Sequence, residues 1–529
     1  MELKGVSLIA GKNAAGGGAE FRAVNPQTGE PLEPRFASAT VEDVDAAARS
    51  ANQAFGSYSR LSSRERARFL RSVADGLEAA SAEIAARAQL ETALPQPRLQ
   101  GEIKRAANQF RLFADVVEEG TWVAARIDTA LPDRQPSPRP DLRSMLRPIG
   151  PVAVFGASNF PIAFSVAGGD TASALAAGNP VIVKAHPAHP GTSEISARVI
   201  SASVAACNLP PGVFSLLFDS GIEVGKALVQ HPLLCAVGFT GSLGAGRALM
   251  DLAAARPRPI PCFAEMSSTN PVFVLPSALR ERGPQLAKGL FNSFTLGAGQ
   301  MCTKPGLVFL PEQPEAEAFL SDLRKLTAGS GAFTLLTPGI AATYKRSLRA
   351  RTGRGDVEVR EAAAAVGACA TSAALLETRI EDFLNSQELS HELFGPASLV
   401  IRYQQREAIL QAAESLDGHL TATVLGSAED LIEYRDLIEI LERKAGRVIF
   451  NGFPTGVEVS HSMVHGGPYP STSDSRFTSV GSLAILRFAR PVCYQGFPEP
   501  ALPDELRDAN PLEILRMLNG RMTSEPVRA

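Results

Sequence analysis

One cysteine of this chain stands in a sequence context suited to nucleophilic chemistry. Cys302 follows the small-residue segment Leu296-Gly-Ala-Gly-Gln-Met301, whereas Cys207 and Cys235 lie in apolar runs. Small residues beside a thiol let a substrate carbonyl approach closely, and they leave backbone N–H groups free to bind an oxyanion. Most cysteines are nevertheless buried and structural, so the context favours Cys302 as a nucleophile but leaves the structural interpretation open.

Three polar side chains accompany short apolar segments that we interpret as strands. Glu265 follows residues 260–264, Asn159 lies in the turn after 151–155, and Lys184 ends an apolar run. A carboxylate beside a pocket can act as a general base, and an amide can donate to an oxyanion. Taken singly, each residue also has a structural interpretation, since Asn is common in turns for local reasons.

The elements that must position these residues alternate between short strands and helices. We predict strands at residues 151–155, 181–184, 213–218 and 236–239, separated by helical segments. This alternation is typical of an α/β fold with a parallel sheet covered on both faces. Ligands bind beyond the carboxyl ends of such strands. One crevice should therefore contain the turns at 156–161, 184–191 and 240–246.

The third of these turns is rich in glycine. Gly241-Ser-Leu-Gly-Ala-Gly246 opens a predicted helix, but it lacks the Gly-x-Gly-x-x-Gly pattern of dinucleotide-binding folds. Such a turn at a helix N-terminus still suits a phosphate group, because backbone N–H groups point outward there. Glycines at strand-to-helix turns are also often purely structural.

The segments before and within this region have simpler patterns. Residues 1–35 predict irregular chain with a hairpin, and residues 40–114 predict helices, one of them capped by Ser62 or Ser63. The small apolar run 162–177 has the length of a helix.

The composition narrows the class of protein. The chain has 529 residues, 45% hydrophobic and 20% charged residues and a net charge of −3, which is typical of a globular protein of several domains. We expect neither nucleic acid nor a membrane as partner, since the chain is weakly acidic and no apolar run is long enough to span a bilayer. The N-terminus lacks the apolar core of a signal peptide, so we expect a cytoplasmic protein.

The cysteines and histidines give no sign of a metal site. Six cysteines occur without a Cys-x-x-Cys pair, and seven histidines occur without a His-Glu-x-x-His arrangement. We therefore predict no disulfide framework, no metal-dependent mechanism and reduced thiols in a cytosol.

Taken together and in this order, the candidate residues resemble the aldehyde dehydrogenase superfamily, and the resemblance covers nearly the whole chain. The segments that carry it are Asn159-Phe-Pro161, Val183-Lys184, Phe239-Thr-Gly-Ser242, Glu265, Gly299-Gln-Met-Cys302 and Glu392-Leu-Phe-Gly-Pro396. This family oxidises aldehydes to acids through a cysteine thioester and a nicotinamide cofactor.

The resemblance implies a role for each residue. Cys302 would be the nucleophile, Glu265 the general base and Asn159 the oxyanion donor. The residues implied to bind the cofactor are Ser158, Lys184, His186, Gly241, Ser242, Glu392 and Phe394. Those implied to contact the substrate are Arg105, Phe160 and Gln300.

The cofactor choice depends on the residues just after Lys184. Many NAD-preferring members carry a glutamate three residues later, where this chain has Pro187. Without that acid the site would not repel a 2′-phosphate, and His186, His189 and Lys184 could attract one. We therefore expect NADP, with NAD as the alternative.

Four segments are similar to a narrower group that contains 2-oxoglutarate semialdehyde (2,5-dioxovalerate) dehydrogenases and NADP-dependent aliphatic aldehyde dehydrogenases. They are Phe155–Pro161, Ala167–Ala174, Lys184–Pro190, and Phe450–Gly456 running on to Gly466-Gly-Pro-Tyr-Pro470. Arg105 favours the first substrate, since an arginine in the substrate tunnel could pair with the distal carboxylate of a semialdehyde acid. The alternative for Arg105 is a surface arginine on its helix. The alternatives for the function are a broad-specificity or medium- to long-chain aliphatic aldehyde dehydrogenase and, in a different class, a non-catalytic binding or structural protein.

The same resemblance implies the domain organisation. Residues 1–124 and 147–264 would form a Rossmann-like cofactor domain, and residues 265–481 an α/β catalytic domain. Residues 125–146 and 482–497 would form a small β oligomerisation element, with strands at 483–488 and 492–494, in a homodimer or homotetramer. Residues 498–529 remain as a C-terminal tail without an assigned role.

Overall fold

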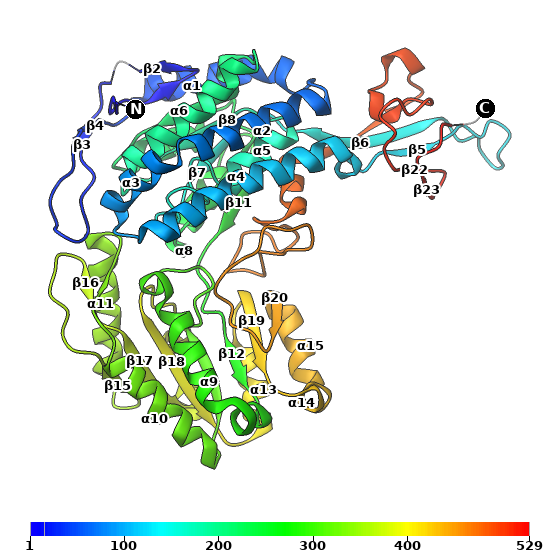
Figure 1. The fold of residues 1–529 in the computed structure, drawn as a ribbon. Helices are drawn as coiled ribbons and strands as arrows, with labels where there is room; N and C mark the ends of the chain where they lie inside the picture. Colours follow the sequence, from blue (N-terminus) through cyan, green and yellow to red (C-terminus); the bar gives the residue numbers. More distant parts are fainter. Residues whose placement is uncertain (1, 15, 528–529) are drawn as a thin grey trace.

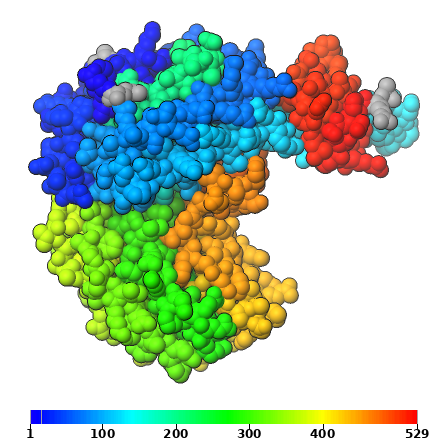
Figure 2. All heavy atoms as spheres, viewed as in Figure 1, coloured from blue at the N-terminus to red at the C-terminus, as the bar shows by residue number. Residues whose placement is uncertain are grey.

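The computed structural model describes residues 2–14 and 16–527. It consists of two α/β lobes, one above the other in Figure 1, and a β arm that projects from the first lobe. Figure 2 shows the same body in solid form, with the C-terminal residues (red) packed on the arm. No helix in the described ranges is both long and apolar enough to cross a membrane.

The sheet of the first lobe has seven strands in the order β11-β10-β7-β8-β9-β1-β2. Their bounds are Leu8–Ile9 (β1), Lys12–Asn13 (β2), Val152–Phe155 (β7), Val181–Lys184 (β8), Phe214–Leu217 (β9), Ala236–Thr240 (β10) and Cys262–Glu265 (β11). Strands β7 to β11 are parallel, which confirms the predicted sheet. The β1–β2 hairpin, also predicted, adds two antiparallel strands at one edge.

Helices pack on both sides of this sheet. They are Val41–Tyr58 (α1), Ser63–Ala79 (α2), Ser81–Thr92 (α3), Gln96–Glu119 (α4), Gly169–Ala177 (α5), Pro190–Ala206 (α6), Glu223–Gln230 (α7) and Leu243–Ala254 (α8). Ser62 caps α2 by accepting a hydrogen bond from the Glu65 backbone N–H, as predicted.

The predicted helix over 162–177 is wrong in its first half. The chain makes irregular turns from Ile162 to Gly168, and α5 begins only at Gly169. The buried carboxylate of Glu102 accepts the backbone N–H groups of Ile162 and Ala163 at 2.8 and 3.0 Å. This long-range partner satisfies the backbone of the turn, so the segment needs no helix.

The second lobe has its own seven-stranded sheet, in the order β15-β17-β18-β13-β12-β19-β20. The strands are Val272–Val274 (β12), Leu307–Pro311 (β13), Glu358–Glu361 (β15), Ala374–Arg379 (β17), Ala397–Tyr403 (β18), His419–Leu425 (β19) and Ala445–Phe450 (β20). The helices are Pro276–Thr295 (α9), Pro314–Ala328 (α10), Pro338–Thr352 (α11), Ile380–Leu384 (α12), Arg406–Ser415 (α13), Ala428–Glu433 (α14) and Arg435–Lys444 (α15). All strands except β15 run parallel, so this lobe is a second α/β unit.

Two small sheets complete the lobes. They pair Glu20–Phe21 (β3) with Phe36–Ala37 (β4), and Phe333–Thr334 (β14) with Ala370–Thr371 (β16).

The arm is a five-stranded sheet in the order β21-β6-β5-β22-β23. Its strands are Arg126–Asp128 (β5), Leu142–Pro148 (β6), Ala489–Gln495 (β21), Arg516–Leu518 (β22) and Arg521–Thr523 (β23). Residues from beyond Pro498 therefore extend this sheet instead of forming a separate tail. Leu502, Leu506 and Ile514 are buried against the strands, which gives this segment an apolar core of its own.

The segment predicted as a strand at 483–488 is a 3₁₀ helix, Ser482–Phe488 (η5). Ala484, Ile485 and Phe488 are buried in the core of the first lobe. A short run of apolar residues is typical of a buried strand and of a buried helix alike. The spacing of its apolar residues therefore cannot tell which of the two forms. The strand of this region, β21, begins at Ala489.

Candidate active site

A cavity of about 650 Å³ lies between the two lobes, at the carboxyl ends of the first-lobe strands. All three predicted turns line it, through residues 156–159, His186 and residues 240–242. The second lobe contributes Cys302, residues from the start of α11, and the pair Glu392 and Phe394. The predicted crevice is thus confirmed, and the cysteine lies in it.

The turn that carries Cys302 is fixed from two sides. Asn270 Nδ2 donates to the carbonyl oxygen of Cys302 at 2.8 Å. Gly299 has φ +67°, and a Cβ there would lie 2.1 Å from the carbonyl oxygen of Gly395. Only glycine permits this conformation and this close approach. The tight contact joins the cysteine turn to the Glu392–Pro396 segment.

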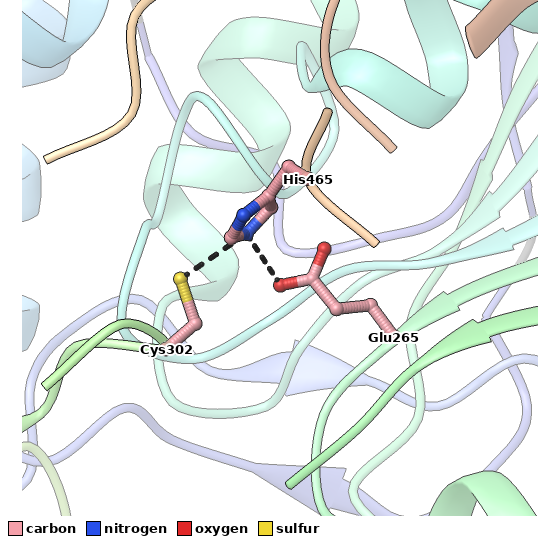
Figure 3. A group of neighbouring side chains, drawn as sticks. All are labelled: Glu265, Cys302 and His465. Carbon is pink, nitrogen blue, oxygen red and sulfur yellow. Dashed lines mark hydrogen bonds and ion pairs between the residues drawn. The ribbon is translucent and has the colours of Figure 1, made fainter. Parts of the chain in front are cut away.

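Cys302 and Glu265 are linked by a histidine that no sequence motif had indicated. His465 Nε2 lies 3.4 Å from Cys302 Sγ and 2.9 Å from Glu265 Oε1. Figure 3 shows the imidazole between the thiol and the carboxylate. The only sequence signal near His465 was the Gly466–Pro470 segment that follows it. That segment was noted for its similarity to the narrower group, and the histidine before it was not considered.

The charges in this group support one another. Burial lowers the pKa of His465, but the neighbouring charges of Glu265 and Cys302 outweigh it and raise the pKa to about 10. Burial raises the pKa of Glu265, yet the charge and hydrogen bond of His465, with a hydrogen bond from Ser479, bring it below its usual value. Since opposite charges stabilise each other in a buried site, the arrangement favours an imidazolium beside a carboxylate.

The segment from His465 to Ser479 folds so that both residues face Glu265. The Ser479 backbone N–H donates to the His465 carbonyl at 2.8 Å, and the His465 backbone N–H donates to Thr478 Oγ1 at 2.8 Å. Ser479 Oγ also donates to Glu265 Oε2. The carboxylate is therefore held at both oxygens, and His465 is held through its backbone.

Asn159 and Gln300 lie together, but of the two Asn159 lines the cavity. The Asn159 amide Nδ2 donates to the backbone carbonyl of Gln300 at 2.8 Å. The Gln300 side chain is buried and accepts from the Leu336 backbone N–H at 3.0 Å. The Gln300 side chain therefore supports the backbone at Leu336, and its contact with substrate stays a prediction.

Two of the predicted cofactor residues surround a glycine-rich helix start. Ser242 caps α8 by accepting from the Ala245 backbone N–H, and Gly241 precedes it. A Cβ at Gly244, in the first turn of the helix, would meet no atom of the described chain within 4 Å. This end of the helix therefore has room for a ligand beside Gly244, as the pyrophosphate of a dinucleotide requires.

The basic residues near β8 are less charged than the sequence suggested. Lys184 Nζ donates to the Asp219 carbonyl at 3.0 Å, and burial lowers its pKa, although Asp219 opposes the shift. Burial also lowers the pKa of His186 well below its usual value, with contributions from His189 and Lys184, and burial lowers the pKa of His189. Both imidazoles are therefore uncharged at neutral pH, which leaves Lys184 as the cation of the three.

Glu392 and Phe394 line the cavity beside Cys302. Ser267 Oγ donates to Glu392 Oε2. The buried Lys304 donates to the carbonyls of Leu393 and Ala397, both at 2.8 Å. Lys304 thereby ties the cysteine turn to the segment that carries Glu392.

Arg105 lies on α4, near enough to Cys302 for the charges of the two side chains to interact. Its guanidinium carbon is 5.1 Å from the centre of the Phe164 ring, and that ring is 6.1 Å from the His465 ring. Arg105 Nε and Nη2 are buried and have no hydrogen-bond partner among the described residues. Burial lowers the pKa of Arg105, while the charges of Cys302, Glu102 and Glu265 favour its protonated form.

Phe160 is buried between this region and a second arginine. Its ring packs edge-on against Phe164 at 5.1 Å, and Arg98 lies over its other side at 5.1 Å. Arg98 Nη2 also donates to the Asn159 carbonyl at 2.9 Å. Arg98 therefore fixes the turn that carries the oxyanion candidate, whereas Nε and Nη2 of Arg105 stay unpaired within the described chain.

Comparison with known proteins assigns the class of this fold and site. The family model described as Aldehyde dehydrogenase family matches residues 13–483. The chain belongs to the aldehyde dehydrogenase family.

Among its relatives, the Alpha-ketoglutaric semialdehyde dehydrogenase 2 of Azospirillum brasilense is 49% identical, over 98% of this chain and 100% of the relative. The Alpha-ketoglutaric semialdehyde dehydrogenase of Acinetobacter baylyi is 45% identical, over 99% of each. The fold is similar to that of the aldehyde dehydrogenase KauB from Pseudomonas aeruginosa, with a TM-score of 0.81 at 21% identity over 94% of this chain and 97% of that one. The aldehyde dehydrogenase from Bacillus cereus, solved as an NAD⁺ complex, has a TM-score of 0.80 at 21% identity, over 93% and 96% of the two chains.

Proposed function

We propose that this chain oxidises 2-oxoglutarate semialdehyde to 2-oxoglutarate with a nicotinamide cofactor. The observation that carries the proposal is Arg105, whose buried Nε and Nη2 atoms have no hydrogen-bond partner in the described part of the chain. An unpaired buried guanidinium is costly unless a ligand supplies the missing acceptors. The distal carboxylate of a semialdehyde acid supplies two acceptors in the geometry of the guanidinium fork. The names of the two curated relatives support the same substrate.

The cavity fits a nicotinamide dinucleotide. The open start of α8 suits the pyrophosphate, and Glu392 and Phe394 line the same cavity as Cys302. The bound oxidised cofactor supplies a hydride acceptor. We propose NADP first, because Pro187 places no carboxylate three residues after Lys184. NAD is the second choice, since burial keeps His186 and His189 uncharged.

The first chemical step belongs to Cys302 and His465. The thiol proton leaves to water, Sγ attacks the aldehyde carbon as the thiolate, and the His465 imidazolium, with Nε2 at 3.4 Å, stabilises the negative sulfur. The carbonyl oxygen becomes an oxyanion, which the Asn159 amide and the Cys302 backbone N–H stabilise by donating hydrogen bonds. Loss of hydride from this adduct leaves a thioester on Cys302.

Hydrolysis of the thioester requires a base beside the sulfur. Glu265 removes a proton from water, and the hydroxide adds to the thioester carbon. The C–S bond then breaks, the acid leaves, and the thiolate is restored. His465, between Glu265 and Cys302, keeps a positive charge next to the departing sulfur.

The arm suggests how subunits assemble. β21 is an edge strand of the arm and β20 is an edge strand of the second lobe. Val448 and Phe450 on β20 are 40% and 43% exposed, which is unusual for a strand that stays unpaired. We propose a homodimer, or a tetramer of such dimers, in which these edges are covered. The six free cysteines support a reducing cytoplasm as its location.

The test compares substrates with the wild-type enzyme. Formation of reduced cofactor is followed with 2-oxoglutarate semialdehyde, succinate semialdehyde and hexanal, each with NADP and with NAD. We expect the two acid semialdehydes to have the higher kcat/KM. A higher kcat/KM for hexanal would contradict the proposed substrate and indicate an aliphatic aldehyde instead. It would not contradict the aldehyde dehydrogenase chemistry.

A further inference from the structure

The Cys302, His465 and Glu265 side chains form a set of metal ligands as well as a catalytic group. One ligand atom from each residue lies within 4.8 Å of the other two. Sγ and Nε2 are 3.4 Å apart, and Nε2 and Oε1 are 2.9 Å apart. All three atoms point toward a common centre (Figure 3).

These separations are close to those around a tetrahedral zinc ion. Zinc binds sulfur at about 2.3 Å and nitrogen or carboxylate oxygen at about 2.0–2.2 Å. At tetrahedral angles those bond lengths place sulfur and nitrogen about 3.6 Å apart and nitrogen and oxygen about 3.4 Å apart. To admit the ion, Sγ and Nε2 need to separate by about 0.2 Å and Nε2 and Oε1 by about 0.5 Å, and Sγ and Oε1, which lie within 4.8 Å of each other, need to lie about 3.6 Å apart.

The ligand types select zinc over the common hard cations. One thiolate, one imidazole and one carboxylate form a mixed soft and borderline set, which suits Zn²⁺ and Co²⁺ and does not suit Mg²⁺ or Ca²⁺. The carboxylate is already oriented by the Ser479 hydroxyl on its second oxygen. Such supporting hydrogen bonds hold ligands in place and raise metal affinity.

The fourth coordination position opens on the cavity. Cys302 and Glu265 both line it, so water or a small ligand reaches an ion at this centre without any change in the fold. A zinc ion there occupies the sulfur lone pair, the imidazole nitrogen and the carboxylate oxygen together. The nucleophile, the positive charge beside it and the base would be lost in a single binding event.

We propose that Cys302, His465 and Glu265 bind one Zn²⁺ reversibly, and that this ion switches the dehydrogenase off. Binding releases the thiol proton of Cys302 and the Nε2 proton of His465 to solvent and involves no change of oxidation state. The loss of activity rests on the proposed function, because it requires Cys302 to be the nucleophile. The binding itself does not depend on which aldehyde the enzyme oxidises.

The first measurement is made by spectroscopy, without turnover. Co²⁺ is titrated into the reduced, metal-free full-length protein, and the thiolate-to-cobalt charge-transfer band is followed in the near ultraviolet. We expect saturation at one equivalent and displacement by Zn²⁺. Cys302→Ser should remove the band, and His465→Asn should weaken binding at least about tenfold. The matched control is Cys493→Ser, which removes an exposed thiol on β21 far from the cluster and should leave the titration unchanged.

The second measurement is inhibition of aldehyde oxidation. Zn²⁺ should inhibit the wild type and the Cys493→Ser variant alike, EDTA should restore activity, and Mg²⁺ should have no effect. Retention of the charge-transfer band in Cys302→Ser, or its loss in Cys493→Ser, would overturn the proposed site. A cobalt band that depends on Cys302, together with zinc-resistant activity, would instead contradict the role of Cys302 as nucleophile.

Discussion

Replacing Arg105 by Met should reduce oxidation of acid semialdehydes far more than oxidation of neutral aldehydes. Methionine keeps an apolar stem beside Phe164 and removes the two unpaired nitrogen donors, Nε and Nη2. A hydrogen bond between charged partners contributes about 1.5–3 kcal/mol. Since about 1.4 kcal/mol corresponds to a factor of ten, kcat/KM for 2-oxoglutarate semialdehyde should fall by roughly 10- to 100-fold.

The same substitution removes a buried positive charge, and a neutral substrate offers that charge no partner. For hexanal we therefore expect kcat/KM to stay constant or to rise. Arg105→Lys should give an intermediate loss with the acid, because lysine keeps the charge but not the planar fork. The matched control is Lys104→Met, which removes an exposed cation from the adjacent position of α4.

The decisive quantity is the ratio of kcat/KM for the acid to that for hexanal. The carboxylate reasoning would be refuted if Arg105→Met lowered kcat/KM for the acid and for hexanal by the same factor, because this would indicate general damage to the active site. It would also be refuted if Lys104→Met changed the ratio as much as Arg105→Met, because the effect would then be long-range electrostatics.

The site and the core support four more predictions. Cys302→Ala should abolish dehydrogenase activity while cofactor binding, measured by fluorescence titration, persists. Glu265→Gln should slow thioester hydrolysis, so stopped-flow absorbance should show a burst of reduced cofactor before a slow steady state; full steady-state turnover would assign the base to another residue. Lys304→Met removes the buried donor to two carbonyls and should weaken cofactor binding by about 1–3 kcal/mol in the same titration. Burial, with the charge of Lys444, lowers the pKa of His419 to about 3. Between about pH 7.5 and about pH 5.5 the unfolded chain therefore takes up a proton at this histidine that the folded state does not. Over this pH range the free energy of unfolding, measured with urea, should fall by about 1.4 kcal/mol more for the wild type than for His419→Gln.

Much of the fold could be predicted because its signals are local. The parallel strands β7 to β10 are short apolar runs bounded by turns, and their positions were predicted to within one or two residues. The turn that precedes α8 was recognisable from its glycines and its serine cap. Such patterns are set by neighbours in the sequence, so they can be read without knowledge of the fold.

The errors have long-range causes. The turns at Ile162–Gly168 look helical from their composition, and they remain irregular because Glu102, some 60 positions earlier, accepts their backbone N–H groups. The segment Leu483–Phe488 has strand-like composition, and it forms a 3₁₀ helix because the core of the first lobe takes up its apolar side chains. Neither partner can be inferred from the segment alone.

The active site shows the same division. Cys302 and Glu265 could be proposed from their motifs, and both line the cavity. His465 could not, since it is 163 positions from Cys302 and 200 from Glu265, and a histidine beside glycines has no periodic signal. Arg105 could be proposed as a tunnel residue, but its unpaired nitrogens become evident only once the helix is packed.

The route of the chain through the site also orders events during synthesis. Residues Cys302 and Glu265 leave the ribosome well before His465 and Ser479, which complete the group around the carboxylate. The core of the first lobe is also incomplete until this part of the chain has been synthesised, because Val480, Ala484 and Phe488 belong to that core. Contacts across such long stretches of sequence form late in folding. A nascent chain that ends before residue 465 therefore lacks the histidine partner of Cys302, and the group around Glu265 is complete only after residues 465–479 have folded against it.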